Sequence, residues 1–255
     1  MIPVSDDNPT LRTPFVTAGL LALIGAAWVW LQGAGFEPRL LAASVCNLGL
    51  VPGEITGAAA LGTAVPMMQG LACAVDAEPV NFLTPLTSMF LHGSWAHLLG
   101  NALFLWVFGN NVEDSMGRLR FLAFYLVCGL AAAAAQVALE PASPVPMVGA
   151  SGAISGVMAA YLVLYPRVRV NMLFIFVVIF RIIPLPAWLV IAYWFAIQVF
   201  SLLPALGGTA ATSGVAFAAH VGGFLAGLAL VKPFENRRLV GVRTLERHRR
   251  HPDHP

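Results

Sequence analysis

The chain has 255 residues, of which 58% are hydrophobic and only 10% are charged, and its mean hydropathy is +0.80. A soluble domain carries roughly 25% charged residues, so this composition excludes an ordinary water-soluble globular protein and predicts a membrane protein. The formal net charge of +2 identifies no class of partner, nucleic acid included, and three cysteines do not make a disulfide framework.

Apolar stretches recur along the chain at lengths that suit a lipid bilayer. A helix that crosses the hydrocarbon core needs about 20 mostly apolar residues. The first ten residues are polar, and the apolar stretch after them has the length of a span, so we expect no cleavable signal peptide. Six spans are predicted, at about residues 14–31, 95–111, 120–139, 151–165, 186–203 and 215–230.

The segments between the spans complete the predicted organisation. Residues 32–94 are rich in Gly, Pro and polar residues, and their apolar sub-segments are short, so we expect a long first extracytoplasmic loop here. The nine apolar residues Met172–Phe180 would cover about half of the hydrocarbon core as a helix, so we interpret them as an interfacial loop element. The prediction is an all-α protein, with a six-helix membrane domain at 1–235 and a basic cytoplasmic tail at 236–255.

Basic residues are distributed unevenly between the predicted loops. With six spans and an inner N-terminus, all of the 14 Lys and Arg residues except Arg39 fall on the inner side. Inner loops of membrane proteins carry an excess of Lys and Arg. We therefore expect both termini in the cytoplasm. The outer segments hold acidic residues instead, at Glu37, Glu54, Asp76, Glu78 and Glu140.

Ser151 lies at the start of the fourth span, between Gly149 and Gly152. One interpretation is a helix N-cap, a position that serine fills readily. The other is a nucleophile at a helix N-terminus, where free N–H groups and the helix dipole stabilise a developing oxyanion.

His220 lies one or two turns into the sixth span, on the order of 10 Å below its outer end. A polar residue inside a span is costly and indicates function, although a packing histidine bonded to a backbone carbonyl is the alternative. A serine with one neighbouring base is the minimal nucleophilic catalyst. No acidic residue lies near it in the spans, so the prediction is a Ser151–His220 dyad.

Small residues follow both reactive positions at four-residue spacing. Gly223 and Gly227 follow His220, and Gly152 and Gly156 follow Ser151. Small residues at this spacing let membrane helices approach closely. These glycines themselves are best explained by helix packing, and the same packing would bring Ser151 and His220 together.

His97 and Asn101 are four residues apart and share one face of the second predicted helix. A zinc site of the H-E-x-x-H kind is not indicated, because the glutamate is missing and Asn is not a usual zinc ligand. Both side chains offer N–H donors, which suits an oxyanion hole. Simple hydrogen bonding between helices is the alternative.

Together these motifs resemble the rhomboid family of intramembrane serine proteases, of bacterial type. The resemblance covers about residues 86–230 and is carried by four segments in family order: Leu91–Asn101 (LHGSWAHLLGN), Phe108–Asp114 (FGNNVED), Gly149–Gly152 (GASG) and Ala219–Gly223 (AHVGG).

The resemblance implies a role for each matching residue. Ser151 would be the nucleophile, His220 its base, and His97 and Asn101 the oxyanion donors. Glu113 would tie neighbouring helices together by hydrogen bonds. The supporting glycines would be Gly149, Gly152, Gly223 and Gly227.

The resemblance also implies single-pass or polytopic membrane-protein substrates and a bacterial inner membrane, without metal or cofactor. Two positions depart from the family pattern. Leu83 and Thr84 stand where many members have a Trp-Arg pair. Ser155 stands where some have an aromatic that stacks on the catalytic histidine, so what orients His220 is open.

Other interpretations compete with the protease. A rhomboid-fold pseudoprotease would bind membrane clients without cleaving them, but such proteins normally lack the nucleophile or the base. A transporter with His220 as a proton site would be expected to show an inverted repeat, and none is evident. Cys46 and Cys73 share the first outer loop, where a disulfide and two unpaired thiols are both possible.

Overall fold

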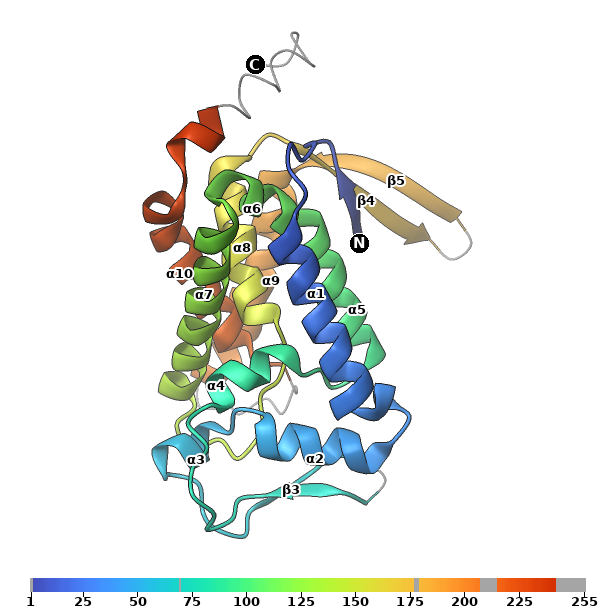
Figure 1. Cartoon of the computed structure of the whole chain (residues 1–255). Coiled ribbons are helices and arrows are strands. Elements are labelled where there is room, and N and C mark those ends of the chain that lie inside the picture. Colours follow the sequence, from blue (N-terminus) through green and yellow to red (C-terminus); the bar gives the residue numbers. More distant parts are fainter. Residues whose placement is uncertain (1, 69, 177–178, 207–214, 242–255) are drawn as a thin grey trace.

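A computed structural model describes residues 2–68, 70–176, 179–206 and 215–241 and shows a bundle of helices flanked by two small sheets (Figure 1). The prediction of a helical membrane protein is confirmed in its main feature, a mostly helical chain. The sheets depart from the all-α prediction.

Helices occupy each of the six stretches that were predicted to be spans. Among the described residues, the helical stretches Arg118–Leu139, Ala187–Pro204 and Phe217–Phe234 are long and apolar enough to cross a membrane, while Phe15–Leu31 and Ser151–Leu164 are shorter apolar helices. In chain order the segments are α1 (Phe15–Ala26) with η1 (Ala27–Leu31), α5 (Trp95–Phe104) with η4 (Leu105–Gly109) and α6 (Asn110–Met116), α7 (Arg118–Leu139), α8 (Ser151–Leu164), α9 (Ala187–Leu206) and α10 (Phe217–Phe234).

The α8 helix lies at the centre of the bundle. Every residue from Gly152 to Tyr161 is buried, and α7, α9 and α10 all pack against this helix. A Cβ atom on Gly223 would lie 2.0 Å from the carbonyl oxygen of Gly152, and one on Gly227 would lie 2.4 Å from that of Gly156. The backbones of α8 and α10 therefore touch directly, as the spacing of small residues predicted.

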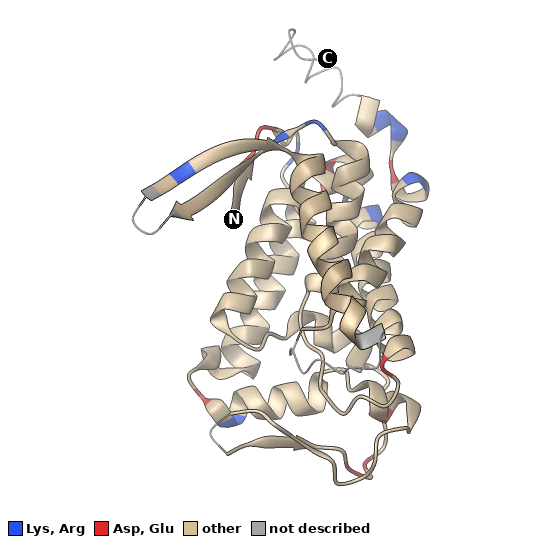
Figure 2. Ribbon diagram, turned by 180° about the vertical axis from the view of Figure 1, so that it is seen from behind, with Lys and Arg blue, Asp and Glu red and all other residues tan. Residues whose placement is uncertain are grey.

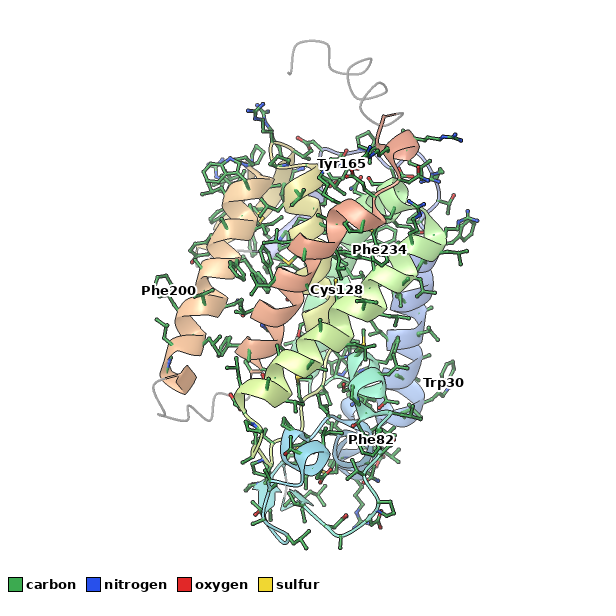
Figure 3. The ribbon with its side chains drawn as sticks, turned by 90° about the vertical axis from the view of Figure 1, so that its left-hand side faces the viewer. Trp30, Phe82, Cys128, Tyr165, Phe200 and Phe234 are labelled. Carbon is green, nitrogen blue, oxygen red and sulfur yellow. A yellow bond between two sulfur atoms is a disulfide. The ribbon has the colours of Figure 1, made fainter. Side chains whose placement is uncertain are left out.

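The outer surface of the bundle is apolar. Figure 3 shows Trp30 and Phe200 on this surface, where they are 77% and 70% exposed, whereas Cys128 lies inside. Soluble monomers rarely expose large contiguous apolar patches. Lipid is the solvent that suits such a surface, and the chain is an integral membrane protein.

The two ends of the bundle differ in charge and in structure. Lys and Arg gather at the end that carries β1 (Ile2–Asp6), β4 (Arg169–Phe176) and β5 (Ile179–Pro186), which we call the basic end (Figure 2). The opposite end, the loop end, carries α2 (Pro38–Leu48), α3 (Pro52–Thr56) and β3 (Ala72–Ala74) (Figure 1). This separation follows the predicted distribution of basic residues.

The loop end is built from residues 32–94, the predicted long loop. A disulfide joins Cys46 to Cys73, so the two thiols are paired. The segment contains short elements: η2 (Gly33–Gly35), α2 (Pro38–Leu48), α3 (Pro52–Thr56), β2 (Ala64–Pro66), β3 (Ala72–Ala74), α4 (Thr84–Thr87) and η3 (Ser88–Phe90).

The apolar stretch Met172–Phe180 belongs to an antiparallel hairpin of β4 and β5, and β1 pairs with the other edge of β4. It is not a helical span. Its aromatic and β-branched residues favour strands, which explains why the interfacial element predicted here has regular structure.

Polar contacts at the basic end fasten α6 to the N-terminal segment. The carboxylate of Glu113 accepts hydrogen bonds from the backbone N–H groups of Val16 and Thr17, at 3.0 and 2.8 Å, and from the Thr17 hydroxyl. Arg12 forms an ion pair with Asp114 at 3.0 Å. Glu113 thus links two helices, as the resemblance implied. Of the predicted tail, residues 242–255 lie outside the described residues.

Candidate active site

Ser151 is the first residue of α8 rather than its N-cap, which is Ala150. The chain enters the helix through Gly149, whose φ of 126° is a conformation that side-chain-bearing residues rarely adopt. The N–H of Gly149 donates to the carbonyl of Ser88 at 2.9 Å. This turn leaves the Ser151 hydroxyl free of a capping role.

The hydroxyl of Ser151 faces His220 on α10. Its Oγ atom lies 2.7 Å from Nε2 of His220. The glycine contacts between α8 and α10 begin at Gly152, next to Ser151, and at Gly223, about one helical turn after His220. Close backbone packing thus brings together side chains that are far apart in sequence.

Gln198, on α9, contacts the other nitrogen of the same imidazole. Its Oε1 atom lies 2.8 Å from Nδ1 of His220, and its side chain is buried. Gln198 was not among the polar residues that the sequence singled out within the spans. The available signal was a lone glutamine within an apolar span, which is costly unless the amide is hydrogen-bonded.

Aromatic rings surround His220 in place of the missing stacking residue. Trp194 of α9 lies 5.8 Å from the imidazole between ring centroids, and Phe217 lies 6.4 Å away. Ser155 instead donates to the carbonyl of Ser151 at 2.6 Å. The aromatic ring nearest to the imidazole therefore comes from α9 and not from α8.

His97 and Asn101 of α5 point toward the turn before Ser151. A Cβ atom on Gly149 would lie 2.7 Å from Nε2 of His97 and 3.5 Å from Nδ2 of Asn101. Both donors therefore converge on one short stretch of backbone. Any side chain at position 149 would displace the His97 ring.

His92 supports Asn101 from behind. Its Nε2 atom lies 2.9 Å from Nδ2 of Asn101. His92 precedes the α5 helix and is buried, and this burial, together with the nearby His97, lowers its pKa to about 3. A neutral imidazole can accept the amide N–H, so His92 fixes the orientation of Asn101.

A cavity of about 940 Å³ joins these groups to the loop end. Its walls include His97, Asn101, Ser151 and His220, and also Met67 from the β2–β3 turn. Among residues 2–68, 70–176, 179–206 and 215–241, no three His, Cys, Asp or Glu side chains are grouped to hold a metal ion.

Comparison with known proteins identifies the family. Residues 80–235 match the Rhomboid domain. Rhomboid protease GluP of Bacillus subtilis is 44% identical over 77 residues, which cover 30% of this chain and 15% of the relative. Presenilin-associated rhomboid-like protein A, mitochondrial, of Danio rerio is 30% identical over 169 residues, covering 59% of this chain and 44% of the relative.

A third relative, the putative rhomboid protease YdcA of Bacillus subtilis, is 36% identical over 77 residues, covering 30% of this chain and 38% of the relative. The chain thus spans less than half the length of each of these relatives. The domain match includes all four predicted site residues and most of the helical bundle, and the chain belongs to the rhomboid family.

Proposed function

We propose that this protein is an intramembrane serine endopeptidase that cleaves transmembrane substrates near the outer interface of the bilayer. The observation that carries the proposal is the 2.7 Å contact between Ser151 Oγ and His220 Nε2 at a cavity that reaches the loop end. Family membership and the two relatives named as proteases support it.

The site can perform acyl transfer in two steps. Ser151 Oγ attacks the peptide carbonyl carbon while His220 Nε2 takes the hydroxyl proton, and His97 and Asn101 donate hydrogen bonds to the resulting oxyanion. His220 then gives the proton to the leaving amine nitrogen. Water attacks the acyl-serine with His220 again as base, which releases the second product and restores Ser151.

The cavity suits this chemistry because hydrolysis needs water below the membrane surface. Its lining combines the polar groups of Ser151, His220, His97 and Asn101 with loop residues such as Met67. We propose that all six apolar segments cross the membrane, with the basic end in the cytoplasm and the cavity open to the outside. For a bacterial chain this places the site at the outer face of the inner membrane.

The test is active-site labelling combined with cleavage. The purified protein in nanodiscs is expected to react with a fluorophosphonate probe and to cleave a panel of single-span substrates. Ser151→Ala should abolish both signals. Ser201→Ala, which changes a serine of α9 outside the cavity wall, should leave both intact. If folded wild-type protein neither labels nor cleaves, the proposal is wrong.

A further inference from the structure

Gln198 is held in one orientation by its own helix. Its Nε2 group donates to the carbonyl of Trp194 at 3.2 Å, one turn earlier in α9. The amide oxygen therefore points at His220 Nδ1, at 2.8 Å. Because the hydrogen-bond network fixes which end of a side-chain amide faces a partner, Gln198 presents an acceptor and not a donor.

An acceptor at Nδ1 selects one tautomer of the imidazole. Nδ1 must carry the proton to donate to Gln198, so Nε2 keeps its lone pair toward the Ser151 hydroxyl. A base that is oriented by a third group is the general form of an activated serine.

We propose that Gln198 is the third member of the site, a positioning residue that fixes the tautomer and ring orientation of His220. The inference rests on the proposed function. In this proposal α9 orients His220, a task to which a stacking aromatic on α8 would contribute in some relatives. A neutral amide does this without placing a second charge in the membrane, where an unpaired carboxylate would be costly.

The experiment separates positioning from packing. Gln198→Met keeps the length of the side chain and removes the acceptor, so kcat should fall about 10- to 100-fold, the range seen when the group orienting a ligand histidine is lost, with KM unchanged. Gln198→Glu restores an acceptor and should recover part of the loss. Ile197→Met, on the exposed face of α9, is the control.

Nitrogen-15 NMR of His220, assigned by comparison with His220→Gln, gives a readout that packing alone would not move. Wild type should show the Nδ1–H tautomer, and Gln198→Met a mixture. If wild type is active and Gln198→Met keeps both the kcat and the His220 tautomer of wild type, the role of Gln198 is refuted. An inactive wild type would refute the proposed function instead, and the tautomer of wild type would still test Gln198.

A separate observation concerns the β4–β5 hairpin, which projects sideways from the basic end of the bundle (Figures 1 and 2). The β1 strand pairs only with Val170–Leu173 of β4, so the outer half extends beyond it. Ile175, Phe180 and Ile182 are 52%, 64% and 62% exposed on one face, and Ile183 is 40% exposed on the other.

Apolar side chains are thus exposed on both faces, and the second face also carries Arg181. A sheet that meets water normally has one predominantly polar face. The strand continues directly into exposed Trp188 and Leu189 of α9, so its apolar surface is continuous with the lipid-facing surface of the bundle. Open backbone edges are not tolerated in the hydrocarbon core, which limits how deeply the hairpin can lie.

We infer that the hairpin is an anchor that lies in the headgroup region of the leaflet at the basic end. Arg169 and Arg181 on its strands have charges complementary to anionic lipid headgroups. The Arg181 stem can lie along apolar surface while its guanidinium reaches the headgroups. Trp188 marks the same level, because tryptophan is enriched at membrane interfaces.

Spin labels in nanodiscs of 3:1 phosphatidylcholine and phosphatidylglycerol test the anchor. Cys128→Ala removes the free thiol, and single labels are placed at Ile182→Cys, at Ala77→Cys in the outer loop as a water-exposed control, and at Val127→Cys on α7 as a lipid-facing control. The Ile182 label should collide more often with oxygen, and less often with a water-soluble nickel chelate, than the Ala77 label does. The same two collision rates should place the Ile182 label at a shallower depth in the membrane than the Val127 label.

Phe180→Asp should move the Ile182 label toward the aqueous values. Collision parameters equal to those of the Ala77 label would overturn the anchor. Spin–spin broadening at Ile182 would also overturn it, since it would assign the surface to a second copy of the chain.

Discussion

Ser151 Oγ and His220 Nε2 lie 2.7 Å apart although 69 residues separate them in the chain. The contact depends on how closely the backbones of α8 and α10 approach, since glycines of the two helices meet immediately below it. Two polar residues in an apolar bundle thus come within hydrogen-bond distance through the packing of glycines.

Gly223→Ala should separate the pair. The added Cβ would lie 2.0 Å from the Gly152 carbonyl oxygen, so α10 must move away from α8. We expect a loss of about 1–3 kcal/mol in the free energy of unfolding and a fall of about 100-fold in kcat, the effect of a 1 Å displacement of catalytic groups. Thermal unfolding and substrate cleavage measure the two effects.

Gly25→Ala is the matched control, because a Cβ atom at this position on α1 would meet nothing within 4 Å. It should leave both quantities near their wild-type values. Full activity in Gly223→Ala would show that the dyad does not depend on this helix contact.

His97→Ala and Asn101→Ala should each lower kcat by about 10²–10³-fold, since each removes one donor to the oxyanion. KM should change little, because the donors act on charge that develops only in the transition state. Steady-state cleavage separates the two parameters. If KM rises while kcat is kept, these residues bind substrate in its ground state and form no oxyanion hole.

The Cys46–Cys73 disulfide should stabilise the loop end. It closes a loop with a sequence separation of 27, which in the chain-entropy view is worth about 3–4 kcal/mol. The double variant Cys46→Ser, Cys73→Ser should therefore have a lower thermal midpoint than wild type. Reduction of wild type with dithiothreitol should lower its midpoint to the same value. The double variant should no longer respond to the reductant; an equal midpoint in all samples would contradict a stabilising bond.

The sequence predicted the helical segments and singled out the four polar residues of the candidate site because both leave local signals, namely the length of the apolar stretches and the polar residues within them. Gln198 was missed since its role depends on where α9 places it relative to His220, and spacing along one helix cannot show a contact between two. The Cys46–Cys73 pairing stayed open for the same reason. The strands within Met172–Phe180 were not predicted, because a short apolar run is compatible with either a strand or a buried helical segment.

His92 should make the folded protein sensitive to acid. Burial and the neighbouring His97 lower its pKa to about 3 from an ordinary value of 6.5, so the folded chain resists protonation that the unfolded chain accepts. The stability contributed by neutral His92 is complete above pH 6.5 and is lost as the pH falls toward 3. Thermal midpoints of wild type and His92→Gln, measured across this range, test the assignment. The thermal midpoint of the variant should be lower than that of wild type at pH 7.5, because Asn101 loses its imidazole partner. On acidification the midpoint of the variant should fall by less than that of wild type. Parallel curves for the two proteins would mean that another group carries the acid sensitivity.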